Sequence, residues 1–274
     1  MEPLSPFRDM PGGCRGAGWE ALVRTARTVT HTAAARPVLH LPDGYRTVLS
    51  MRLLLLRHGQ TPSNVEGILD AAYPGPGLTE LGRRQAAAVP DALAGEDIAA
   101  IHVSPLLRTH ETAAPLAAAR GLDPRITTGL EEIRAGDLQG RQEPDSVEAY
   151  QAMHHRWSAG EIDEGMPGGE SAQQFWDRWN GALARIAAQH APDATVVAVS
   201  HGAAIRVFAS VVGELGAASL ADRPLYNTGL VTLVGDPAAG WRVEGWESSP
   251  VGGAHLLRGA EHDVTADDAA DAKV

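Results

Sequence analysis

Cysteine, lysine and long apolar runs are scarce in this 274-residue sequence, and each shortage excludes a class of protein. Cys14 is the single cysteine, so an intrachain disulfide cannot form and zinc sites built from several thiolates are excluded. This cysteine usage fits a reducing compartment, and we expect a cytoplasmic protein. Lys273 is the single lysine among 23 basic residues, which leaves no lysine in the centre of the chain for a Walker loop or a Schiff base. Arginine must therefore provide any binding of phosphate.

Membrane and nucleic-acid partners are not expected from the composition. No stretch approaches the roughly 18 apolar residues that a spanning helix requires, and the proline-interrupted N-terminus lacks the apolar centre of a signal peptide. The net charge is -11 and the pI is near 5.4, whereas DNA, RNA and anionic membranes all require a basic surface. Hydrophobic residues make up 44% of the chain, enough to bury a sizeable core, so we expect a globular protein.

The chain divides into three segments by composition. Residues 1–50 show no sustained helical or strand period, so we expect an N-terminal extension that is largely disordered, with one transient helix over 18–28. Met51 directly precedes the first convincing strand, and the alternative that translation begins there stays open. Residues 51–250 alternate strand-like and helix-like stretches and are expected to form the folded domain. Residues 251–274 turn to Gly, Ala and Asp, which predicts an acidic, mobile tail.

Reactive side chains follow three predicted strands, each at the point where the strand ends. Short apolar runs that lead into a polar turn are typical of strands buried on both faces of a parallel sheet. In open α/β sheets the carboxyl ends of such strands form the ligand-binding edge. The groups are Arg57 and His58 after residues 51–56, Arg108 one helical turn past 98–103, and Ser200 with His201 after 195–199.

Helices are expected between these strands. Their approximate ranges are 79–94, 104–120, 146–158, 171–186 and 202–212, with a final hairpin of 229–234 and 241–246. Ser104 and Pro105 have the residue types of an N-cap and a first helical position, and Ser171 with Gln174 matches a capping box. Residues 137–170 interrupt the alternation and predict a helical cap over the sheet edge. In that cap, His154 is expected on an exposed helix surface.

A site at this edge would combine two imidazoles, two guanidiniums and a carboxylate from Glu131 or Glu132. Guanidinium groups bind phosphoryl oxygens bidentately and stay charged at every accessible pH, so the pattern favours a strongly positive pocket for a dianionic phosphate. Arginines beside the histidines would repel a divalent cation, so we expect no metal and no other cofactor.

Six motifs, in this order along the chain, resemble those of the histidine phosphatase superfamily, which has the phosphoglycerate mutase-like fold. The resemblance covers about 51–250 and implies a three-layer α/β/α fold with a mostly parallel central sheet and a helical cap insertion at about 137–170. The motifs are RHGQTPSN (57–64), LTELGRRQA (78–86), SPLLRTHETA (104–113), LEEIRAGDLQG (130–140), PGGES (167–171) and VVAVSHG (196–202).

The resemblance also implies residue roles. His58 would be the nucleophile that forms a phosphohistidine, and counting back from Gly136 in the family's pattern selects Glu132 as the general acid and base. Arg57, Arg108 and His201 would hold the phosphoryl oxygens. The resemblance adds further substrate-binding positions at Gly59, Asn64 and, near the rim of the pocket, Asn227.

Three functions are consistent with these motifs. A phosphatase that hydrolyses a small phosphorylated metabolite is favoured, because the family's mutases resemble RHG followed by a Trp-Asn pair, whereas here Ser63 precedes Asn64. A mutase would also be expected to carry a lysine for a second anionic group, and Lys273 lies in the tail. The alternatives are a phosphoglycerate mutase-type transfer and a non-catalytic protein that binds a phosphorylated ligand. The sequence does not identify the leaving group, and it leaves a homodimer open.

Overall fold

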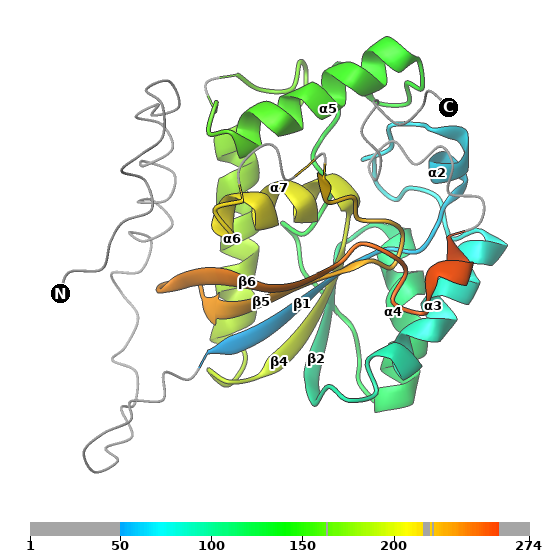
Figure 1. Ribbon diagram of the computed structural model, residues 1–274, viewed down its shortest axis with the longest axis vertical. Coiled ribbons are helices and arrows are strands. Elements are labelled where there is room, and N and C mark those ends of the chain that lie inside the picture. Colours follow the sequence, from blue (N-terminus) through cyan, green and yellow to red (C-terminus); the bar gives the residue numbers. More distant parts are fainter. Residues whose placement is uncertain (1–49, 163, 216–219, 221, 258–274) are drawn as a thin grey trace.

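The computed structural model describes residues 50–162, 164–215, 220 and 222–257 (Figure 1). The predicted disorder of the N-terminal extension, its short helix and most of the acidic tail lie outside these residues. A six-stranded sheet forms the centre, in the order β3-β2-β4-β1-β5-β6. The strands are β1 (Met51–Arg57), β2 (Ile98–Val103), β3 (Arg125–Ile126), β4 (Thr195–Ser200), β5 (Leu230–Asp236) and β6 (Gly240–Glu247).

The sheet is mostly parallel, as the sequence predicts. Strand β1 pairs in parallel with β4, β4 with β2, and β2 with β3. Strands β5 and β6 form the expected hairpin and add an antiparallel edge beside β1. Parallel strands need crossover connections, which the helices between them supply.

Strand β1 lies in the centre of the sheet because its apolar residues can be buried on both faces. Successive side chains of a strand point to opposite faces, and the leucines at 53–56 are all fully buried. Leu53 and Leu55 join one hydrophobic cluster, and Leu54 and Leu56 join the other. Each buried leucine contributes about 1.5–3 kcal/mol of favourable transfer energy, so the run itself specifies a central position.

Helices cover both faces of the sheet and complete the predicted three layers (Figure 1). Helices α3 (Glu80–Ala92) and α4 (Leu107–Arg120) pack against Leu54 and Leu56. Helices α6 (Ala172–Ala188) and α7 (Gly202–Val212) cover the opposite face, where Trp176 and Trp179 of α6 contact Phe208 of α7. The capping box of α6 is present, since the Ser171 hydroxyl accepts from Gln174 N while the Gln174 side chain accepts from Ser171 N.

The region 137–170 contains a 3-10 helix (Gly136–Leu138) and α5 (Pro144–Ser158). Helix α5 packs against α7 at the upper end of the molecule in Figure 1. The predicted exposure of His154 is wrong. Tyr150, His154 and Trp157 lie at helical spacing on the inner face of α5, and all three are buried. The His154 ring lies edge-on to Tyr150 with centroids 4.1 Å apart, so tertiary packing of the cap decides its environment.

Two further predictions are corrected by the structure. Helix α4 begins at Leu107 with Leu106 as its N-cap, so Ser104 lies before the cap, and its hydroxyl is hydrogen-bonded to the His201 ring. The predicted tail begins too early, since residues 251–257 are described and include a short 3-10 helix (Ala254–Leu256). There Leu256 is buried, and its carbonyl accepts a 2.9 Å hydrogen bond from Gln85 Nε2 of α3.

Burial of His154 predicts that the free energy of unfolding decreases at acid pH. Burial, with Arg206 and His155 nearby, lowers the pKa of His154 to about 3. The folded state thus holds the neutral ring, whereas the unfolded chain takes up a proton below about pH 6.5, so the free energy of unfolding falls as the pH falls from 6.5 toward 3. When the pH falls from 7 to 5, the free energy of unfolding should decrease by about 2 kcal/mol less in the His154→Gln variant than in the unsubstituted protein, as measured by urea denaturation.

A matched variant at the exposed His255 supports this comparison. The control is His255→Gln, which removes an imidazole that is exposed in the fold. An identical loss of stability in His154→Gln and in the unsubstituted protein would contradict the assignment of the acid sensitivity to His154.

Candidate active site

Three neighbouring strands deliver the predicted reactive groups to one edge of the sheet. His58 follows β1, His201 follows β4, and Arg108 lies in the first turn of α4, which follows β2. The His58 and His201 ring centroids are 5.2 Å apart, and His58 N donates to Ser200 O at 3.0 Å. His58, His201 and Arg108 are all buried.

His58 is held in one tautomer by its own loop. Its Nδ1 lies 2.8 Å from the carbonyl oxygen of Gly59, and a carbonyl can only accept, so Nδ1 carries the hydrogen and Nε2 carries the lone pair. Burial is the main cause that holds the pKa of His58 well below its ordinary value, and the charges of Arg108 and Arg57 lower it further. The ring is therefore neutral at pH 7, with a nucleophilic nitrogen.

His201 is placed between two polar partners. Arg108 Nε donates to His201 Nδ1 at 3.2 Å, so the hydrogen of the neutral ring is on Nε2, which donates to Ser104 Oγ at 2.7 Å. Burial lowers the pKa of His201 well below its ordinary value, and Arg108 and His58 add to this effect. Sequence reasoning missed the role of Ser104, although its position directly after β2 could have indicated a place at the site.

The two guanidinium groups are buried and fixed by backbone carbonyls. Arg57 Nη1 donates to Leu225 O at 2.6 Å, and Arg108 Nη2 donates to Asp70 O at 3.0 Å. Burial lowers the pKa of Arg108, while the carboxylates of Asp70 and Glu132 act in the opposite direction. Asp70 and Glu132 both line the pocket together with Arg108.

The structure distinguishes Glu132 from Glu131. The Glu132 carboxylate is 5% exposed, and it accepts from the N–H groups of Ala203 and Ala204 at 3.1 and 2.8 Å. Those groups belong to the first turn of α7, where the helix dipole favours a negative charge. The Glu131 side chain instead turns back to Gly129 N. Glu132 lines the pocket beside His58, and Glu131 does not.

The remaining predicted positions divide into one pocket residue and two supporting residues. Asn64 lines the pocket, and its Oδ1 accepts from Thr61 N and from Asn227 Nδ2 at 3.0 and 3.2 Å. Asn227 also donates to His58 O, so it connects the loop after β1 to α2 (Pro62–Glu66) and does not line the pocket. Gly59 likewise lies outside the lining, and its N–H donates to Thr112 Oγ1 at 2.9 Å.

The pocket contains residues that sequence reasoning did not select. Asp70 and Tyr150 both line it, and the Tyr150 hydroxyl donates to Ile133 O at 2.8 Å. No short motif marks either residue, because loop and cap packing bring them to the site. The full lining is His58, Thr61, Ser63, Asn64, Ile68, Leu69, Asp70, Arg108, Glu132 and Tyr150.

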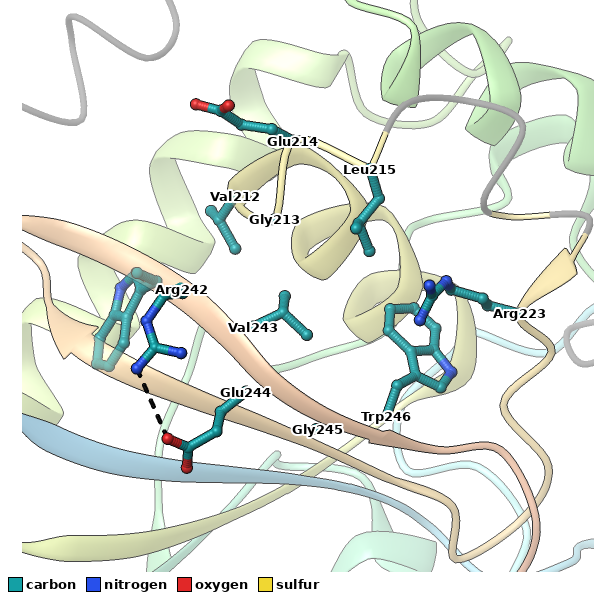
Figure 2. Close-up of a pocket in the computed structure, with 11 residues that line it drawn as sticks. Val212, Gly213, Glu214, Leu215, Arg223, Arg242, Val243, Glu244, Gly245 and Trp246 are labelled. Carbon is teal, nitrogen blue, oxygen red and sulfur yellow. Dashed lines mark ion pairs between the residues drawn. The ribbon is translucent and has the colours of Figure 1, made fainter. Parts of the chain in front are cut away.

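A larger cavity of about 480 Å³ lies elsewhere, between the end of α7 and strand β6 (Figure 2). Its charged lining includes Arg242 and Glu244, which form an ion pair at 3.6 Å, and Arg223 beside Trp246. None of the predicted catalytic residues lines it. Size alone therefore does not identify the reactive site.

Paired imidazoles, two buried guanidiniums and a glutamate at the carboxyl edge of a parallel sheet define an α/β protein of the phosphoryl-binding class. The sequence model of the histidine phosphatase superfamily (branch 1) matches residues 53–249. The chain belongs to this superfamily. The family, the fold and the enzyme class predicted from the motifs are thereby confirmed.

Two curated relatives have similar sequences. The PE-PGRS family protein PE_PGRS11 of Mycobacterium tuberculosis (strain ATCC 25618 / H37Rv) is 34% identical over 216 residues, which is 73% of this chain. The matched region spans only 37% of that relative. "Probable phosphoglycerate mutase GpmB" of Salmonella choleraesuis (strain SC-B67) is 30% identical over 72% of this chain and 90% of its own length.

Two solved structures with similar folds have the names of phosphatases. A mycobacterial glucosyl-3-phosphoglycerate phosphatase is 30% identical, with a TM-score of 0.61 over 73% of this chain and 100% of its own. The alpha-ribazole phosphatase of Shigella flexneri is 26% identical, with a TM-score of 0.56 over 73% of this chain and 97% of its own.

Neither a candidate metal cluster nor a membrane-spanning helix occurs among the residues that the structure describes. Within them, no group of three or more His, Cys, Asp or Glu side chains could hold a metal ion. Among the same residues, no helix is long and apolar enough to cross a bilayer.

Close backbone contact between the His58 loop and α3 predicts a severe effect of Gly82→Ala. A Cβ at Gly82 would lie 2.1 Å from Gln60 O, so the loop that carries His58 or the start of α3 must move. We expect a loss of about 1–3 kcal/mol in the free energy of unfolding, measured by urea denaturation. The control is Gly95→Ala, because a Cβ there meets no atom within 4 Å. Equal stability of the two variants would contradict this close contact.

Proposed function

We propose that this protein is a phosphomonoester hydrolase that forms a phosphohistidine on His58. The observation that carries the proposal is the tautomer of His58, whose Nδ1–H donates to Gly59 O and leaves the Nε2 lone pair for attack. This neutral ring lines the pocket together with Arg108 and Glu132. The substrate is a small phosphorylated metabolite.

In the first step, His58 Nε2 attacks phosphorus and the bond from phosphorus to the ester oxygen breaks. Arg57 and Arg108 stabilise the charge on the phosphoryl oxygens, and Glu132, which enters this step in its protonated form, gives its proton to the departing alkoxide and becomes a carboxylate. In the second step, Glu132 accepts a proton from water as the water oxygen attacks phosphorus. The phosphorus–nitrogen bond then breaks and inorganic phosphate leaves. The chemistry requires no metal, so we propose metal-independent activity.

Related proteins favour hydrolysis but include a mutase name. The names of the glucosyl-3-phosphoglycerate and alpha-ribazole phosphatases support a phosphatase, whereas one relative is named a probable phosphoglycerate mutase. Among the described lining residues of the pocket, Arg108 is the single cation besides any charge on His58. A substrate with a second anionic group would therefore find little additional positive charge, which also favours hydrolysis of monoesters.

The proposal is tested by trapping the intermediate with a panel of phosphomonoesters in the presence of EDTA. We expect release of inorganic phosphate and an acid-labile, base-stable phosphoenzyme, because phosphohistidine has these stabilities. His58→Ala should lose the phosphoenzyme and at least about 10³-fold in kcat/KM, whereas His255→Ala, which changes an exposed residue, should keep both. Interconversion of 2- and 3-phosphoglycerate without net phosphate release, or phosphate release by His58→Ala at the original rate, would overturn it.

The role of Glu132 has a separate test based on leaving groups. An alkoxide needs a proton to depart, whereas p-nitrophenolate departs readily without one. Glu132→Gln should therefore slow alkyl phosphates by about 10²–10⁴-fold and p-nitrophenyl phosphate much less, as measured by kcat for each. Glu148→Gln is the matched control, because Glu148 is exposed on α5 and does not line the pocket. An equal loss on both substrates would contradict the acid role.

A further inference from the structure

The backbone that carries Glu132 is held by a single side chain of α6. Arg178 Nη1 donates to the carbonyl oxygens of Gly129 and Glu131 at 3.0 and 2.9 Å, and its Nη2 donates to the carbonyl oxygen of Glu132 at 3.0 Å. One guanidinium therefore bonds three carbonyls in four consecutive residues. Because the guanidinium is planar and rigid, these bonds fix the orientation of the segment as well as its distance from α6.

Glu170 orients this guanidinium from the opposite side. Its carboxylate accepts from Arg178 Nε and Nη2 at 2.7 and 2.6 Å, a bidentate pair, and also from Arg134 N at 2.8 Å. Glu170 is 3% exposed and the Arg178 side chain 17% exposed, so solvent screens the pair weakly. Glu170 thus contacts the segment directly after Glu132, and Arg178 contacts the segment at and before it.

Backbone contacts also join the turn that carries Glu170 to the segment that follows Glu132. Asp137 N donates to Pro167 O at 2.8 Å, and a Cβ at Gly136 would lie 2.0 Å from that oxygen. The turn at 165–171, which contains the PGGES motif, is therefore packed closely against the strand-to-cap segment that carries Glu132. The sequence marks this motif, but the mechanism described above gives it no role.

We propose that Glu170 and Arg178 are positioning residues that set the place of the Glu132 carboxylate relative to the leaving-group oxygen. A general acid must come within about 2.6–3.2 Å of the atom that it protonates, and a displacement of about 1 Å can cost 10²-fold in rate. Neither residue lines the pocket, so both act through Glu132. This inference rests on the proposed acid role of Glu132.

The test compares leaving groups in Arg178→Lys. Lysine keeps the charge, but its single nitrogen cannot reproduce the fork that joins three carbonyls and a carboxylate. We expect kcat for an alkyl phosphate to fall by about 10–100-fold and kcat for p-nitrophenyl phosphate by less than about threefold. Arg185→Lys is the matched control, because Arg185 also lies on α6 and donates to Thr128 O but makes no bond to residues 129–134 among those described. It should change neither rate.

Combination with Glu132→Gln distinguishes positioning from general support of the fold. If Arg178 acts through Glu132, the double variant Arg178→Lys/Glu132→Gln should hydrolyse the alkyl phosphate no more slowly than Glu132→Gln alone. Glu170→Gln is a second variant, which keeps the size of the side chain and removes its charge. It should show the same selectivity for leaving groups, and it replaces Arg178→Lys in the test if that variant folds poorly.

Equal loss on both substrates in Arg178→Lys and Glu170→Gln, with unchanged urea midpoints, would overturn the inference. Multiplied losses in the double variant would overturn it too. Failure of the proposed function is distinguishable, because in that case Glu132→Gln itself would show no preference between the two leaving groups. If Glu132→Gln slows the alkyl phosphate selectively and the variants at 170 and 178 do not, the positioning role is rejected and the acid role of Glu132 is kept.

Discussion

The parallel ladder between β1 and β4 ends with Arg57 opposite Ser200, and this register sets the positions of the two residues that follow. It places the rings of His58 and His201 5.2 Å apart. A slip of one residue would turn every side chain of β1 to the other face and would withdraw the imidazole from His201. The register in which β1 packs between its neighbouring strands therefore fixes the distance between the two rings.

The two imidazoles of the site stay neutral because they are buried beside two guanidinium groups. Burial and the neighbouring positive charges both lower the pKa of His58, so one environment keeps the ring unprotonated and supplies cations for a phosphoryl group. Asp70 and Glu132 counter the charge of Arg108 from the same pocket. The same few residues therefore determine both the protonation of His58 and the charges that surround it.

Local patterns predict much of this fold, and packing between distant segments explains most of what they miss. The leucines at 53–56 identify a buried central strand, and strand ends that lead into reactive residues predict the site edge, because both signals depend on neighbours in sequence. Ser104 has the residue type of a helix cap, but its hydroxyl bonds to the His201 ring, a partner that lies far away in the sequence and is brought near only by the tertiary structure. Packing of α5 on α7 buries His154, and Asp70 reaches the pocket through a loop without a sequence period.

The hydroxyl of Tyr150 bonds to Ile133 O, the carbonyl next to Glu132 in the chain. Tyr150 belongs to the cap helix and also lines the pocket, so this wall of the pocket is joined by a hydrogen bond to the segment that carries Glu132. A substitution that widens the pocket by moving α5 would therefore also displace Glu132. The shape of the pocket and the position of this side chain are thus coupled, and an engineer or natural selection would have to change the cap and the segment around Glu132 together.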